Sequence, residues 1–148
     1  MWTDLVLALA FTAFLTLVVP NVGEDKFLQN MVNKTAPDNL TLRLYTSNTT
    51  PAETDTAATY TEAAGGGYAA VALTAANWGT VTQGNPSSIA YPQVTFTFNG
   101  GAVLNLYGYF VVGTVDGVLR WAERFANPPF VMQNNGDQTL VTPVITAE

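Results

Sequence analysis

From Asp38 onward, polar and apolar residues alternate with a period of two, in short runs separated by turn-forming residues. The clearest run is YPQVTFTF at 91–98, which places Val94, Phe96 and Phe98 on one face and two threonines on the other. Successive side chains of a β-strand point to opposite faces, so such a run can bury one face and solvate the other. The body of the protein is therefore expected to consist of strands that share a core.

About seven runs of this kind can be recognised, with turn residues recurring roughly every eight to twelve positions. The expected strands lie at 40–47, 68–74, 78–82, 91–98, 103–112, 118–125 and 138–147. Many short strands with this spacing are typical of an antiparallel sandwich or a jelly-roll-like barrel. We expect a mainly β fold of that class, formed as a single domain, with one short N-terminal helix.

Two details of the strand order can be predicted from the same pattern. Asn99, Gly100 and Gly101 supply the positive φ angles of a tight turn, which predicts a hairpin between 91–98 and 103–112. The end of the second run is too apolar to be exposed on either face, so we expect it to be a central strand. In the first run of the body, Leu40, Leu42 and Leu44 are expected to share the buried face.

The N-terminus carries a different signal, because residues 5–19 (LVLALAFTAFLTLVV) are apolar on all sides. The run is shorter than the roughly 20 residues of a membrane-spanning helix, and no basic residue precedes it as in a signal peptide. Three interpretations stay open: a signal or membrane anchor, an arm buried against the domain or a neighbouring subunit, and an appended start. We therefore divide the chain into an apolar segment, 1–19, and a β-sandwich domain, 20–148.

A short amphipathic helix is expected near 24–33. Phe27, Leu28, Met31 and Val32 follow one another at the spacing that places side chains on one face of a helix. Such a helix can cap one end of a sheet, or it can serve as a docking helix for a partner.

The composition argues against catalysis and against nucleic-acid binding. The chain has no histidine and no cysteine, which supply most general bases, thiolate nucleophiles and soft metal ligands. The net charge is -6 and the five cationic residues form no cluster, whereas phosphate binding needs a basic patch. Acids in the loops PAETDT (51–56) and NNGDQ (134–138) are better explained by turns than by calcium. We expect no enzyme activity, no catalytic residue, no cofactor, no metal site and no direct binding of nucleic acid.

Late aromatic residues are the remaining candidates for contact with other molecules, since aromatics are enriched at interfaces. The possible interface residues are Tyr107, Trp121, Phe130, Arg120 and Arg124. The two arginines flank Glu123, with which they are expected to form an ion pair at an interface or on the free surface.

A series of short motifs runs through the body of the chain. They are VPNVGE (19–24), TAPDNLTLRLY (35–45), TPAETDT (50–56), GGGYA (65–69), YGYFV (107–111), LRWAERF (119–125) and NNGDQ leading into VTP (134–143). This series resembles a group of small virion structural proteins of tailed bacteriophages, over about residues 19–148. Members of the group begin close to the VPNVGE motif, which favours the appended start and argues against a membrane role.

The resemblance implies a structural protein of the phage particle. The leading expectation is a decoration or cement protein on the outer surface of the head, bound to the major capsid protein or other virion proteins and to copies of itself. A receptor- or glycan-binding module of a tail fibre or baseplate is the first alternative. A membrane-anchored or secreted β-domain is the second.

Overall fold

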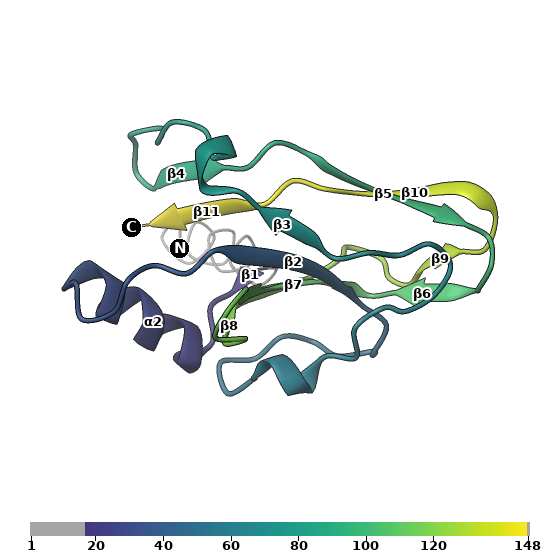
Figure 1. Ribbon diagram of the computed structural model, residues 1–148, viewed down its shortest axis with the longest axis horizontal. Coiled ribbons are helices and arrows are strands. Elements are labelled where there is room, and N and C mark those ends of the chain that lie inside the picture. The colour runs from purple at the N-terminus through teal and green to yellow at the C-terminus, as the bar shows by residue number, and fades with distance from the viewer. Residues whose placement is uncertain (1–16, 148) are drawn as a thin grey trace, which may run out of the picture.

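A computed structural model describes residues 17–147 as two β layers with one helix beside them (Figure 1). The elements in chain order are β1 (Leu17–Val18), α2 (Asn21–Met31), β2 (Leu40–Tyr45), β3 (Val71–Leu73), β4 (Ser87–Ala90), β5 (Val94–Asn99), β6 (Leu104–Leu106), β7 (Gly108–Gly113), β8 (Leu119–Arg124), β9 (Phe130–Met132), β10 (Asn135–Val141) and β11 (Val144–Ala147). Two short 3-10 turns, Ala57–Thr59 and Ala75–Asn77, lie in the loops. The mainly β, antiparallel, sandwich-like class is confirmed, with eleven strands in the described residues rather than about seven.

The first layer is a five-stranded antiparallel sheet in the order β1-β8-β7-β2-β3. β7 lies at its centre and is buried along its whole length, which confirms the central position predicted for the end of the run 103–112. That run is divided at Tyr107, however, and its first part forms β6, which pairs with β9 in a separate ribbon.

The second layer is a long two-stranded ribbon. β5 pairs with β10 and β4 pairs with β11, all antiparallel, and prolines 92 and 143 lie between the two halves. The hairpin predicted between 91–98 and 103–112 is therefore wrong. Gly100 does adopt a positive φ of 70°, but the turn carries the chain from the β5–β10 ribbon into the β6–β9 ribbon.

The main core fills the space between the layers. It contains Val94, Phe96 and Phe98 of β5, together with Leu42 and Leu44 of β2, so both predicted buried faces are confirmed. Leu40 packs against the same cluster from its edge. Burial of these side chains supplies the main driving force for bringing the layers together.

A second cluster lies on the outer face of the five-stranded sheet. It is built from Tyr45, Tyr60, Phe110, Val112, Leu119 and Ala122, and Val22 of α2 packs against it. The loop that follows β2 contributes Tyr60 and α2 contributes Val22, so both cover this face of the sheet. Because β7 contributes to a cluster on each face, its sequence is apolar without alternation.

Of the apolar segment 1–19, the structure describes only residues 17–19. Leu17 and Val18 form β1 and pair with Glu123 and Ala122 of β8 at the edge of the sheet. Residues 1–16, on which the three interpretations of this segment depend, lie outside the described residues. Within residues 17–147, no helix is both long enough and apolar enough to span a membrane.

Candidate interaction surface

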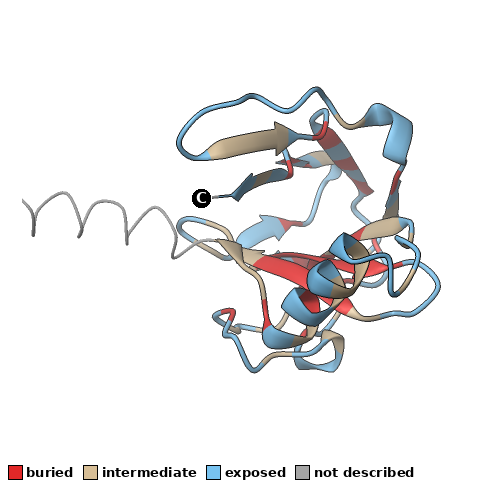
Figure 2. Cartoon of the chain, turned by 90° about the vertical axis from the view of Figure 1, so that its left-hand side faces the viewer, coloured by how far each residue is buried: buried red, intermediate tan, exposed pale blue. Residues whose placement is uncertain are grey.

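The predicted helix is α2, and it packs on β8 through a glycine. Gly23 is the one buried residue of α2, and a Cβ at this position would collide with the backbone carbonyl of Arg120. The helix axis therefore lies close to the strand, as only glycine permits. In Figure 2, α2 faces the viewer in front of the buried strands of the five-stranded sheet, and its ribbon is coloured mostly as exposed or intermediate.

The apolar face of α2 is turned outward instead of into the domain. Successive helix residues are rotated by about 100°, which puts Leu28 and the C-cap residue Val32 roughly opposite Gly23. Met31 lies on the flank, and Phe27, one turn after Gly23, lies nearer the sheet. The exposed fractions are 37% for Phe27, 61% for Leu28, 78% for Met31 and 73% for Val32. We call these four residues the α2 face. No described part of the chain buries it, and clustered exposed apolar side chains are typical of interaction sites.

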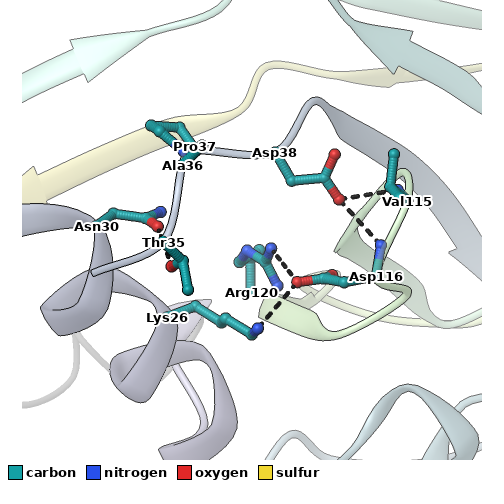
Figure 3. Close-up of a pocket in the computed structure, with 9 residues that line it drawn as sticks. All are labelled: Lys26, Asn30, Thr35, Ala36, Pro37, Asp38, Val115, Asp116 and Arg120. Carbon is teal, nitrogen blue, oxygen red and sulfur yellow. Dashed lines mark hydrogen bonds and ion pairs between the residues drawn. The ribbon is translucent and has the colours of Figure 1, made fainter. Parts of the chain in front are cut away.

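A shallow hollow of about 290 Å³ lies beside α2 (Figure 3). Lys26 and Asn30 of α2 line one side, and the segment 35–38 that follows the helix lines another. The turn between β7 and β8 contributes Val115 and Asp116, and β8 contributes Arg120. The hollow thus lies where the helix, the segment leading to β2 and a sheet turn meet.

Charged groups in the hollow are paired with one another. One carboxylate oxygen of Asp116, Oδ2, lies 3.2 Å from the Lys26 ammonium and 3.0 Å from the Arg120 guanidinium. Arg120 also donates to the Val118 carbonyl at 2.8 Å, and Asp38 accepts the backbone N–H groups of Val115 and Asp116. With two cations and two carboxylates, the hollow is balanced in charge and ties α2 to the β7–β8 turn.

The hydrogen bonds of Asp116 also affect its ionisation. Desolvation acts to raise the pKa of its carboxyl group, but donors from Arg120, the Val118 backbone and Lys26 together outweigh it and hold the pKa below its usual value. Asp116 is therefore a carboxylate at neutral pH, held by its donors. This chemistry suits a structural junction better than proton transfer.

Two of the five predicted interface residues are buried, and the prediction is wrong for them. Trp121 is 1% exposed and packs edge-on against Trp78, with ring centroids 6.4 Å apart. Arg120 is 3% exposed. Neighbouring residues of β8 point to opposite faces, so Trp121 enters the core between the layers while Arg120 lies beneath α2 in the ion-pair network.

Arg124 and Tyr107 hold the loop after β2 in place. Arg124 donates to the carbonyl of Thr49 at 2.8 Å and to the Asn48 side chain at 2.6 Å, and its guanidinium lies 5.2 Å from the centre of the Tyr107 ring. Tyr107 is half-buried against the outer cluster. Both residues therefore already have partners within the chain.

The ion pair predicted for Glu123 does not form, since neither arginine lies within salt-bridge distance of it in the described residues. Its carboxylate instead accepts a 2.6 Å hydrogen bond from the hydroxyl of Tyr109. Burial is the main cause that raises the pKa of Tyr109, and the negative charge of the nearby Glu123 carboxylate raises it further. The phenol therefore stays neutral and donates the hydrogen bond. The alternation of β8 explains this outcome, because Arg120 and Arg124 lie on the face opposite Glu123.

Phe130 keeps an exposed aromatic surface. It is 39% exposed and stacks on Phe125 with ring centroids 5.0 Å apart. The larger apolar surface is the α2 face. Its helical spacing predicted either a helix that caps the sheet or a docking helix, and none of its four residues is among the five predicted interface residues.

The loop acids considered for calcium make hydrogen bonds within their own turns. Asp55 accepts from the backbone of Ala52 and from the hydroxyl of Tyr60, and Asp137 accepts from the backbones of Gln133 and Asn134. Over residues 17–147, no group of three or more His, Cys, Asp or Glu side chains is arranged to hold a metal ion.

Comparison with known proteins identifies no relative. No family model matches the chain, and no match was found among curated proteins or among solved structures.

Proposed function

We propose that the protein is a structural component of a tailed-bacteriophage particle, attached to the outer surface of the head as a decoration or cement protein. It acts by binding the assembled shell, in many copies, across the seams between capsid subunits. Binding to the intact shell but not to its broken form raises the free energy needed for disassembly.

The observation that carries this proposal is the α2 face. Exposing Leu28, Met31 and Val32 to water is unfavourable, and burial against a partner would recover about 25 cal/mol for each Å² covered. A face of this size is too small for tight binding alone, because stable interfaces bury roughly 800 Å² on each partner. An array of copies on a repeating lattice turns weak contacts into durable attachment.

The motifs behind the phage resemblance also support a structural role. LRWAERF includes the strand β8. Trp121 of this strand packs in the main core, Arg120 belongs to the ion-pair network, and Arg124 contacts the loop after β2. YGYFV forms most of the central strand, β7. VPNVGE contains Gly23, which sets the close approach of α2 to the sheet. These residues build the fold and the position of α2, as expected for a protein that acts by shape.

Heat-induced loss of the genome tests the proposal. Particles that lack the protein are expected to release DNA at a lower temperature than complete particles, as measured by a dye that reports accessible DNA. Adding back the purified full chain should restore the higher temperature. If particles without the protein retain their DNA equally well, the cement function is wrong.

Variants of the α2 face test the contact. Leu28→Glu together with Met31→Glu is expected to reduce binding to the shell at least tenfold, measured by co-sedimentation with particles, because two charges then replace apolar contacts. Leu28→Met with Met31→Leu is the matched control and should bind normally. Both positions are exposed, so the thermal unfolding of the isolated protein should change little. Equal binding by both double variants would exclude the α2 face as the contact.

The exposed Phe130 favours a second candidate, a receptor- or glycan-binding module of the tail. Aromatic side chains that are half exposed and stacked can supply a binding platform. Binding of the purified protein to host cells, lost in Phe130→Ala and unchanged in the α2 face variant, would favour this function over the first.

A further inference from the structure

The last strand, β11, leaves one of its edges open. β11 pairs with β4, and no other described strand is hydrogen-bonded to it (Figure 1). The far edge of β4 is already occupied, because Thr82 and Ser88 exchange backbone hydrogen bonds of 2.8 and 3.0 Å and Gly79 donates to Ala90. The open edge of this ribbon in the described chain is therefore that of β11.

The register identifies the backbone groups at the open edge. Tyr91 donates to the Pro143 carbonyl, so this pair faces inward between the two strands. Hydrogen-bonded pairs recur at every second residue of an antiparallel ladder, which makes Ile145 and Ala147 the next residues to bond with β4. Val144 and Thr146 then direct their N–H and C=O groups away from β4.

We propose that β11 pairs with β11 of a second copy of this chain, antiparallel and about a two-fold axis at Ile145. In that register Val144 of each copy lies opposite Thr146 of the other, and each such pair exchanges two backbone hydrogen bonds. The dimer thus gains four backbone hydrogen bonds, and the two β4–β11 ribbons become one four-stranded sheet.

The side chains of β11 suit this partner. Residues 143–147 carry no charge, and Val144, Ile145 and Thr146 are β-branched, which favours packing between strands. Charges and bulges are two of the devices by which natural edge strands avoid such pairing, and β11 has neither, while Pro143 lies just before the residues that would pair. Ile145 already packs against the main core, so the two-fold places both Ile145 side chains side by side at its rim.

This inference rests on the edge of β11 and is independent of the α2 face and of the proposed function. Such a dimer would form in purified protein without any phage component, and its failure would leave shell binding untouched.

Disulfide formation tests the register, and the chain contains no cysteine of its own. In Ile145→Cys the two Cα atoms would lie about 4.5 Å apart in a non-hydrogen-bonded pair, within the range that a disulfide spans. We expect a covalent dimer to form in oxidised glutathione and to disappear on reduction. Thr146→Cys is the control, since its two copies would be offset along the strands by more than about 7 Å. A dimer from neither variant, or equally from both, would overturn the proposal.

A second experiment measures the non-covalent dimer of the full chain by sedimentation equilibrium. Thr146→Pro removes an outward N–H and leaves the bonds to β4 intact, which is the position where an edge strand tolerates proline. The dimer dissociation constant is expected to rise at least tenfold, while Thr146→Val, which keeps the N–H, should leave it unchanged. Unaltered thermal unfolding of the monomer would show that Thr146→Pro still folds. A wild-type protein that stays monomeric at all concentrations, or a Thr146→Pro variant that dimerises normally, would contradict the pairing.

Discussion

Trp121→Ala is expected to lower the free energy of unfolding by about 3–5 kcal/mol, the range typical of removing a large aromatic side chain from a core. Trp121 is 1% exposed and belongs to the cluster between the two layers, where it contacts the ring of Trp78. The surrounding strands are fixed by their ladders, so they cannot collapse into the space that the ring leaves. Urea denaturation followed by circular dichroism measures the change.

Two control variants separate core packing from surface effects. Trp121→Phe should cost much less than Trp121→Ala, because it keeps most of the apolar volume and removes an indole N–H that is buried without a partner in the described chain. Phe130→Ala removes an aromatic side chain that is 39% exposed and should also cost less. If Trp121→Ala changed the unfolding free energy by less than about 1 kcal/mol, as at a surface site, the burial of this side chain would be wrong.

The sequence pattern predicted strand faces better than strand partners. Val94, Phe96 and Phe98 alternate with threonines, and this local pattern alone is enough to predict which face of β5 is buried. The partner of β5 depends on a strand some forty residues further along the chain, β10, and no local pattern encodes that pairing. Of the three residues predicted to supply positive φ angles, only Gly100 does so, and the bend there leads from one ribbon to another instead of joining a hairpin.

The candidate site was harder to predict because both faces of β8 are covered. Arg120 and Trp121 differ in polarity, which suggests one solvated face, yet Arg120 is buried beneath α2, where it pairs with the partly exposed Asp116. The spacing of the α2 face predicted a helix correctly. Which side of that helix meets the sheet depends on Gly23, since the residue with no side chain allows the closest approach. The pattern of apolar residues in the sequence therefore does not identify the side of the helix that contacts the sheet, because that contact is made by a glycine.

Asp116→Asn is expected to lower the free energy of unfolding at pH 7 by about 1.5 kcal/mol, the lower end of the range for hydrogen bonds to charged groups, because Asp116 is partly exposed while Arg120 is buried. The loss comes from Arg120, whose side chain is only 4% exposed and would be left with its charge uncompensated, while Asp116 itself is 29% exposed. Lys26→Met removes the other cation of the network, which is 26% exposed, and should cost no more than about 1 kcal/mol. Urea denaturation of the three proteins at the same pH gives the comparison.

The pH dependence of the Asp116→Asn effect distinguishes charge from shape. Because donors from Arg120 and its neighbours hold the pKa of Asp116 below its unfolded value of about 3.9, the carboxylate stabilises the fold fully above that pH. The stabilisation is lost as the pH falls through the lower, folded pKa, where the carboxyl becomes protonated. The difference between wild type and Asp116→Asn should therefore be constant from pH 7 to about 5 and shrink below about pH 4. A difference that stayed the same down to pH 2 would mean that Asp116 stabilises the junction by packing and not by its charge.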